Sequence, residues 1–313
     1  MQAISSRSYG ARDPKVRQHK GERNPAQDVQ APDSSVRTEA DALVRTADQI
    51  AALMATYAIG FKEQLKQTAY RLQLANHWSI EPGSKVLEIG CGQGDTTAVL
   101  AELVGEQGSV LGVDPARPDY GSPISIGQSA QHLEDGPYGP VLDIRLNFSD
   151  WSMIDNHFDY AVMSHCSWYF DSFAQLLYTL KEARSRSAKL CFAEWSLEPL
   201  QTNQIPHYCA IIAQSLIAKL KPDLQLNIQN PFPESVILDA LSMSGWKVES
   251  RHVVERPNVD DGHWEVQELI RLAERTDLAI PSEVQAWLME QANILKGSPT
   301  PYASLPSFGY VCS

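Results

Sequence analysis

The chain has 313 residues, 43% of them hydrophobic, which is enough for one large α/β domain with insertions or for two modest domains. Its formal net charge of −12 provides no overall positive field for a phosphate backbone, so nucleic acid is not expected as a partner. The five cysteines contain no C-x-x-C pair, so we expect neither a disulfide framework nor a zinc knuckle. No run of about 18 apolar residues occurs, so we expect no membrane span. Both observations lead us to expect a cytoplasmic protein.

The N-terminal segment, residues 1–37, is predicted to be a disordered tail. It is rich in Arg, Lys, Gln, Pro, Ser and Asp and has few large apolar side chains to bury. It also lacks the apolar core of a signal peptide. A mitochondrial presequence is the alternative, but such presequences are poor in acids, and this segment contains Asp13, Glu22, Asp28 and Asp33.

Residues 38–83 are predicted to form a helical cap of two or three helices. Between Thr38 and Trp78 there is no proline and a single glycine, and Glu81-Pro82-Gly83 then ends the helical pattern. The apolar residues at helical spacing are Leu43, Ala47, Ile50, Met54, Ile59, Leu65, Leu72 and Leu74.

From residue 84 onwards, short apolar strands alternate with helices, which is the signature of βαβ units and a parallel sheet. The expected strands are 85–90, 109–114, 141–146, 159–164, 189–195, 247–254 and 308–312. The expected helices are 95–104, 127–133, 173–184, 205–220, 234–244, 264–275 and 282–295. We therefore predict an α/β domain over residues 84–313, with a seven-stranded, mostly parallel sheet, helices on both faces, and helical lid insertions at about 201–232 and 257–300.

A glycine-rich loop follows the first expected strand. Gly90, Gly92 and Gly94 lie between this strand and helix 95–104, where a parallel sheet binds an extended cofactor. Glycine allows the backbone to approach a ligand closely and to adopt a positive φ. Asp114 ends the second strand and is placed to accept hydrogen bonds from ribose hydroxyls.

The glycine spacing distinguishes two classes of cofactor. A dinucleotide fingerprint G-x-G-x-x-G starting at Gly90 or Gly92 requires glycine at position 95 or 97, where the chain has Asp95 and Thr97. The observed spacing is G-x-G-x-G. Glu88, two positions before the first glycine, would repel a pyrophosphate but suits a sulfonium amino acid with its ammonium group.

At these positions the chain resembles the class I S-adenosylmethionine-dependent methyltransferases. VLEIGCGQGD is similar to their first motif, VLGVD to their second, FDYAVMSHCSWYF to their fourth and AKLCFAEW to the strand that follows, so the resemblance is clear over about residues 84–199. It implies a Rossmann-like fold and S-adenosyl-L-methionine as cofactor, with S-adenosyl-L-homocysteine as product. The implied substrate is a small molecule methylated at oxygen or nitrogen, with secondary metabolism as one setting.

The acidic net charge predicts no nucleic-acid partner, the lack of a long apolar run predicts no membrane partner, and a homodimer is left open. The Asn/Asp-Pro-Pro-aromatic tetrad of enzymes that methylate nucleobase amino groups is absent after the fourth strand. This absence agrees with the acidic net charge.

Position by position, the resemblance places the three glycines along the methionine part of the cofactor, Glu88 near its amino group and Asp114 at its ribose. Asn147 and Phe148 take the place of a polar residue and a backbone amide against adenine, although Asp is commoner there and Asp150 is offset. The expected cofactor-binding residues are Glu88, Gly90, Gly92, Gly94, Asp114, Asn147, Phe148 and Ser164.

Methyl transfer mainly requires alignment of nucleophile and methyl group and exclusion of water, and a base is needed only if the nucleophile arrives protonated. His165, after the fourth strand, is the candidate general base. The alternative is a histidine whose ring is simply hydrogen-bonded in a half-buried loop.

The expected substrate pocket comprises residues after the fourth and fifth strands and one in the insertion beyond them. Trp168 and Tyr169 form either an aromatic wall or part of the core. No cluster of Asp, Glu and His has the spacing of metal ligands, so no metal is expected. The pocket residues are Trp168, Tyr169, Glu194, Trp195 and His207.

Two other functions remain open at the level of sequence. One is a methyltransferase-like enzyme that binds the cofactor but catalyses a cyclisation or rearrangement without methyl transfer, because a fold does not determine its chemistry. The other is a binding or regulatory protein with a vestigial cofactor site. The intact glycines and Asp114 argue against this last reading.

Overall fold

The computed structural model of the protein describes residues 45–155, 157–224, 226–297 and 300–313. The tail predicted for residues 1–37 lies outside the described residues. Within the described ranges, no helix is both long and apolar enough to cross a membrane.

A seven-stranded sheet with the order β3-β2-β1-β4-β5-β7-β6 confirms the predicted fold class. Strands β1 to β5 pair in parallel, and β7 lies antiparallel between β5 and β6. The strands are β1 (Lys85–Ile89), β2 (Ser109–Asp114), β3 (Leu142–Leu146), β4 (Phe158–Ser164), β5 (Ser187–Trp195), β6 (Val248–Val254) and β7 (Ser307–Cys312).

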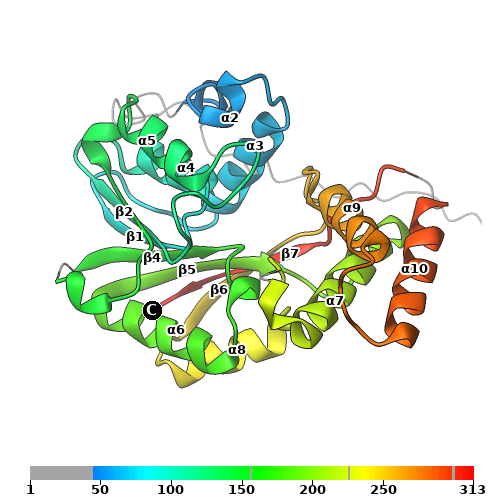
Figure 1. Ribbon diagram of the computed structural model, residues 1–313. Coiled ribbons are helices and arrows are strands. Elements are labelled where there is room, and N and C mark those ends of the chain that lie inside the picture. Colours follow the sequence, from blue (N-terminus) through cyan, green and yellow to red (C-terminus); the bar gives the residue numbers. More distant parts are fainter. Residues whose placement is uncertain (1–44, 156, 225, 298–299) are drawn as a thin grey trace, which may run out of the picture. The chain divides into compact units, whose positions relative to one another are not determined.

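Helices cover both faces of the sheet, because apolar side chains project from both faces and each face needs a covering layer of helices. Figure 1 shows α4 (Asp95–Val104) and α5 (Ile126–Glu134) on one face, and α6 (Phe173–Arg186) and α8 (Glu234–Met243) on the other. Two buried apolar clusters fill the two interfaces.

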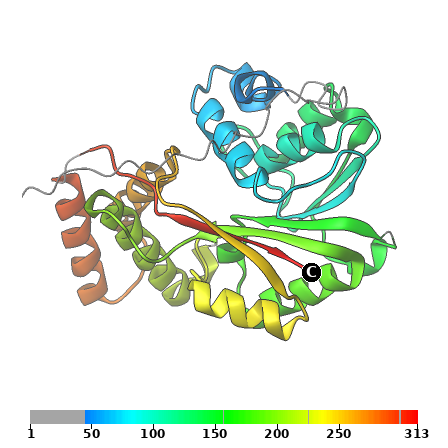
Figure 2. The ribbon, with the colours of Figure 1, turned by 180° about the vertical axis from the view of Figure 1, so that it is seen from behind.

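Three further helices form a group beyond the sheet, on the side toward which β5 runs (Figures 1 and 2). They are α7 (Ile205–Leu220), α9 (Asp261–Glu274) and α10 (Ser282–Lys296), and they share an apolar cluster of their own. All three fall in or beside the insertions predicted from the sequence. Their role as a lid stays a prediction.

Helix α9 begins at Asp261, three residues before the predicted start at 264. The segment before β7 packs against this first turn: Ser304 Oγ accepts a hydrogen bond of 3.0 Å from the Gly262 N–H. A Cβ on Gly262 would lie 2.5 Å from the carbonyl oxygen of Ala303, so the close approach requires glycine. The helix thus includes Asp261, Gly262 and His263 in addition to the predicted residues.

The N-terminal helices are α1 (Ala47–Ala51), α2 (Ala55–Ala58) and α3 (Gln64–Ala75). Here the apolar pattern was partly wrong, because Ile59 is 62% exposed and Leu65 is 40% exposed. Instead, α3 buries Gln64, Gln67 and Arg71, at positions i, i+3 and i+7 of one helical face. A polar face turned inward indicates a polar site next to α3.

Candidate cofactor and substrate site

The three glycines of the loop after β1 differ in the space around them. Each has a positive φ, of 81° at Gly90, 52° at Gly92 and 86° at Gly94. A Cβ on Gly90 would lie 2.6 Å from Cβ of Cys166, and one on Gly94 would clash with Leu133. A Cβ on Gly92 would meet nothing within 4 Å. Gly90 and Gly94 are thus required by packing, whereas Gly92 faces open space.

Asp114 fixes the loop from the end of β2. Its Oδ2 accepts a hydrogen bond of 2.9 Å from the Gly92 N–H, and its Oδ1 accepts one of 2.8 Å from the Ala116 N–H. The carboxylate of Asp114 therefore holds Gly92 directly. The Asp114 side chain is buried next to Gly92, the glycine that faces open space.

Glu88 is the penultimate residue of β1, and it is only 2% exposed. Among the described residues, its carboxylate accepts a side-chain hydrogen bond from Thr97 Oγ1 alone, at 2.6 Å. Burial raises the pKa of Glu88 to about 8, against the effect of that hydrogen bond, and the charges of Asp114 and Asp95 add to the rise. A nearby cation would favour the ionised form.

Arg71 of α3 is a buried cation, 9% exposed, that forms no ion pair with any described carboxylate. Its Nη1 atom has no hydrogen-bond partner among the described residues, and the same holds for the buried Oγ of Ser164. An uncompensated buried guanidinium is costly, so an anionic group of a ligand would stabilise it.

Two cavities lie in this region, and Arg71 borders both of them. The predicted cofactor residues in β1, β2, β4 and the loop after β1 line neither cavity: Glu88, Gly90, Gly92, Gly94, Asp114 and Ser164. The larger, of about 550 Å³, reaches the glycine loop at Gln93 and Asp95 and extends between α3, α7 and α9. The smaller, of about 80 Å³, lies at the carboxyl ends of β4 and β5. Four residues border both cavities, which places the cavities next to each other: Arg71, Tyr169, Asp261 and Glu265.

The smaller cavity brings together the residues predicted for the chemistry and the substrate pocket. Trp168 and Trp195 are buried in its wall, so they also belong to the core. Tyr169 is 50% exposed and borders both cavities. All six predicted residues line this cavity: His165, Trp168, Tyr169, Glu194, Trp195 and His207.

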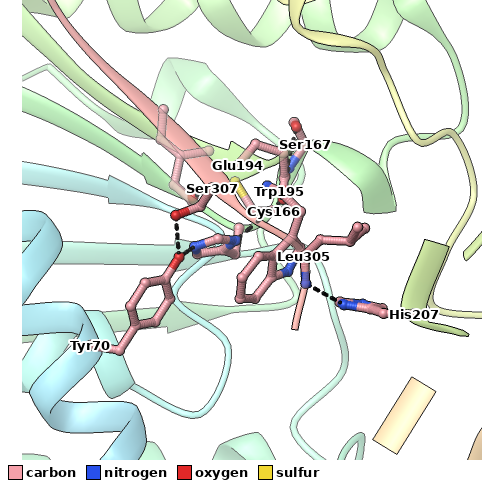
Figure 3. A network of polar contacts seen from close by, with 10 residues as sticks. Tyr70, Cys166, Ser167, Glu194, Trp195, His207, Leu305 and Ser307 are labelled. Carbon is pink, nitrogen blue, oxygen red and sulfur yellow. Dashed lines mark hydrogen bonds and ion pairs between the residues drawn. The ribbon is translucent and has the colours of Figure 1, made fainter. Parts of the chain in front are cut away.

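Both ring nitrogens of His165 face protein groups. Nε2 lies 2.8 Å from the hydroxyl oxygen of Tyr70, which is in turn hydrogen-bonded to Ser307 Oγ at 2.7 Å (Figure 3). Nδ1 lies 3.3 Å from Glu194 Oε1, within ion-pair distance but without the alignment of a hydrogen bond. Burial lowers the pKa of His165 despite the opposing effect of Glu194, so the ring is neutral near pH 7.

Glu194 connects the ends of β4 and β5. Its Oε2 accepts hydrogen bonds from the N–H and the Oγ of Ser167, at 3.0 and 2.7 Å, and its Oε1 accepts one of 2.9 Å from the Trp195 N–H. These contacts satisfy the buried carboxylate within the protein. Glu194 therefore shapes the wall of the smaller cavity.

His207 is fully buried in α7, and one hydrogen bond determines which of its ring nitrogens carries the proton. Its Nδ1 accepts a hydrogen bond of 2.9 Å from the Leu305 N–H (Figure 3). Burial lowers the pKa of His207 to about 3, so the ring is neutral and its proton lies on Nε2. That Nε2 has no partner among the described residues.

The two residues predicted against adenine border neither cavity. The Phe148 N–H already donates to the Asp114 carbonyl at 2.9 Å, and the Asn147 N–H donates to Ala116 at 2.9 Å. Their part in binding adenine stays a prediction. The described residues also contain no group of three or more His, Cys, Asp or Glu side chains that could hold a metal ion.

Sequence reasoning missed Arg71, Tyr70, Asp261 and Glu265. For Arg71 a signal was present, because Gln64, Gln67 and Arg71 recur at helical spacing and could be recognised as a polar face. Tyr70, Asp261 and Glu265 lie far along the chain from the motifs, and only the tertiary packing brings them to the cavities.

Together, the strand order, the glycine loop after β1 and the acid after β2 define a Rossmann-like enzyme that binds a nucleoside-containing cofactor at the carboxyl edge of its sheet. Two family models match overlapping parts of the chain, and both include the glycine loop. The model for protein-L-isoaspartate(D-aspartate) O-methyltransferase matches residues 46–118, and that for a methyltransferase domain matches residues 86–187.

Among solved structures, a cyclopropane-fatty-acyl-phospholipid synthase-like protein from Lactobacillus casei is 33% identical, with a TM-score of 0.77 over 85% of this chain and 98% of that one. Methyltransferase phomM′ of Diaporthe leptostromiformis is 27% identical over 59% of each chain. Demethylmenaquinone methyltransferase of Bacillus cereus is 34% identical over 31% of this chain. The chain spans 59% and 39% of the lengths of these two curated relatives. The chain belongs to the class I S-adenosylmethionine-dependent methyltransferase family.

Proposed function

We propose that the protein binds S-adenosyl-L-methionine at the glycine loop and transfers its methyl group to an oxygen or nitrogen of a small molecule. The observation that carries this proposal is the open space at Gly92, next to the carboxylate of Asp114 that holds its N–H, in a protein region that also contains the buried charged groups Glu88 and Arg71. Glu88 would hold the ammonium and Arg71 the carboxylate of the methionine part, and Asp114 would hold the ribose. These charges fit a zwitterionic ligand and would repel a pyrophosphate on the side of Glu88.

When bound, the cofactor supplies a methyl group on a positively charged sulfur. The chain itself would bind, orient and exclude water: Asp114 holds the loop, and the buried rings of Trp168 and Trp195 keep the smaller cavity dry. A cavity of about 550 Å³ is within the usual size range for small ligands.

The role of His165 as general base stays a proposal. For it to take a proton from a substrate hydroxyl, its Nε2 would have to exchange the contact with Tyr70 for one with the substrate. Glu194 faces the other nitrogen and would stabilise the resulting imidazolium.

A second candidate is a reaction without methyl transfer to oxygen or nitrogen, such as a cyclisation. The name of the 33% identical solved structure favours it, since that protein is described as cyclopropane-fatty-acyl-phospholipid synthase-like. The charged walls of the larger cavity, which include Asp261, Glu265 and Arg71, argue against a long acyl chain as substrate.

Calorimetry with S-adenosylhomocysteine tests the cofactor site, and release of S-adenosylhomocysteine from the cofactor tests the reaction. We expect binding, and release that depends on a small polar metabolite. Release that depends only on vesicles of unsaturated phospholipid would favour the second candidate. Absence of binding would refute both.

A further inference from the structure

The charged side chains of α9 and of the turn after it that lie at the larger cavity fall into two groups. Arg271 pairs with Glu268, and Arg275 pairs with Asp277, so these charges are compensated within the protein. Asp261 and Glu265 have no such cationic partner among the described residues.

Each of these two carboxylates is instead held by the amide of a glutamine. Gln67 Nε2 donates to Asp261 Oδ2 at 2.7 Å, and Gln214 Nε2 donates to Glu265 Oε2 at 2.7 Å. An amide orients a carboxylate but does not neutralise its charge. The other oxygens, Asp261 Oδ1 and Glu265 Oε1, accept no hydrogen bond from any described residue.

The two carboxylates point to one place. They are separated by four residues in α9, so they lie on the same face of the helix. Both line the larger cavity, which reaches the glycine loop, and the smaller one, which lies at the end of β4. This is the junction at which a transferred group would meet its acceptor.

An independent feature of the same cavity also indicates a ligand. His207 is 0% exposed and lines the smaller cavity, and the N–H of its Nε2 has no partner in the described part of the chain. A buried donor left unpaired costs about 1 to 3 kcal/mol, which an acceptor on a ligand would remove. The cavity thus offers the carboxylates of Asp261 and Glu265 and a neutral donor, and it is also lined by Glu194, whose carboxylate is satisfied within the protein, and by the cation Arg71.

We propose that the methyl acceptor is an amine, whose ammonium form is held between Asp261 and Glu265 and whose neighbouring oxygen atom accepts a hydrogen bond from His207. This inference rests on the proposed function. Compounds with an amino group next to a carbonyl or hydroxyl oxygen have the required pattern.

Glu265 then has a catalytic role, because an ammonium cannot attack a methyl group. Its carboxylate accepts one proton from the ammonium, which frees the nitrogen lone pair. The new N–C bond forms as the C–S bond breaks, and the positive charge moves from sulfur to the methylated nitrogen. No oxidant, reductant or further reactant is needed.

The environment of Glu265 suits proton transfer near neutral pH. Burial raises the pKa of Glu265 to about 7, the hydrogen bond from Gln214 opposes the rise, and Asp261 and Glu268 add to it. The other titratable or charged groups that line the smaller cavity are Arg71 on α3, His165 and Tyr169 after β4, Glu194 on β5 and His207 on α7.

Sinefungin provides a test without knowledge of the substrate. It resembles S-adenosylhomocysteine but carries an ammonium on a carbon in place of the methylated sulfur, so its charge lies where the methyl group would lie. We expect the wild type to prefer sinefungin over S-adenosylhomocysteine in calorimetry. Glu265→Gln and Asp261→Asn should each reduce that preference about tenfold, the scale of a hydrogen bond to a charged group, with unchanged affinity for S-adenosylhomocysteine.

The matched control is Glu274→Gln, since Glu274 lies on the same helix, is paired with Lys296 and borders neither cavity. It should leave both affinities unchanged. In the wild type, the preference for sinefungin should rise as the pH increases through about 7, because Glu265 becomes ionised. This series needs no variant and so does not depend on a variant folding.

The outcomes separate the two proposals. If S-adenosylhomocysteine does not bind the wild type, the proposed function fails and the inference fails with it. If it binds, but the preference for sinefungin is independent of pH and of both carboxylates, the amine inference alone is overturned.

Discussion

The buried carboxylate of Glu88 makes cofactor binding dependent on pH. With a pKa of about 8 in the free protein, about one molecule in a hundred is ionised at Glu88 at pH 6, and about one in two at pH 8. If the ammonium of the ligand requires the ionised form, the apparent affinity for S-adenosylhomocysteine should fall about 50-fold from pH 8 to pH 6. This corresponds to about 2.3 kcal/mol at 1.36 kcal/mol per pKa unit.

Calorimetry at pH 6, 7 and 8, in buffers of different ionisation enthalpy, measures both the affinity and the proton released. Close to one proton should leave per ligand bound at pH 6. Glu88→Gln should bind more weakly at pH 8 and should lose most of the pH dependence. Glu106→Gln, at an exposed position after α4, is the matched control and should behave as the wild type.

The same group affects stability in the ligand-free protein. Because the folded-state pKa is raised above the ordinary value of 4.5, the stabilisation of neutral Glu88 is fully present below that value and is lost as the pH rises through about 8. Glu88→Gln should therefore raise the melting temperature of the free protein at pH 8. An affinity that is flat from pH 6 to pH 8, without proton release, would show that Glu88 does not meet the ligand's charge.

Three other substitutions test the site. Gly92→Val should abolish binding of S-adenosylhomocysteine in a folded protein, whereas Gly245→Val, at another positive φ with free space, should impose similar backbone strain and leave calorimetric affinity intact. Asp114→Ala should weaken binding by about 1.5 to 3 kcal/mol, because the ribose and the Gly92 N–H both lose their acceptor; a change of only a few tenths would contradict the assignment. His165→Gln should lower kcat less than about tenfold with an amine acceptor, and a loss of about 10²- to 10⁴-fold with a pH profile set by an imidazole would instead identify His165 as the base.

The sequence predicted the sheet well because β1, β2, β4 and most of β5 are short apolar runs. Helix α4 agrees at both ends, since Gly94 and Gly105 lie at its termini with positive φ. The place of the glycines, Glu88 and Asp114 at the ends of β1 and β2 could also be predicted, because these residues are local in sequence, and their role in binding the cofactor stays a prediction.

The polar face of α3 and the neighbours of His165 could not be predicted from the sequence in the same way. Helix α3 turns polar residues inward and leaves Leu65 exposed, which reverses the rule that apolar periodicity marks the buried face. The neighbours of His165 come from distant segments, with Tyr70 on α3 and Glu194 on β5. Whether a histidine is free or engaged depends on such contacts, and no spacing rule contains them.

The position of β7 has a consequence for how the chain is made. Residues 307–312 are fully buried and separate β5 from β6, which pair with β7 and not with each other. During synthesis, β5 and β6 therefore present unpaired edges until residue 312 has left the ribosome, and an open edge is a template for pairing with another chain. A nascent chain halted before Ser307 should consequently need a chaperone, and its aggregation should stop once the last strand is supplied.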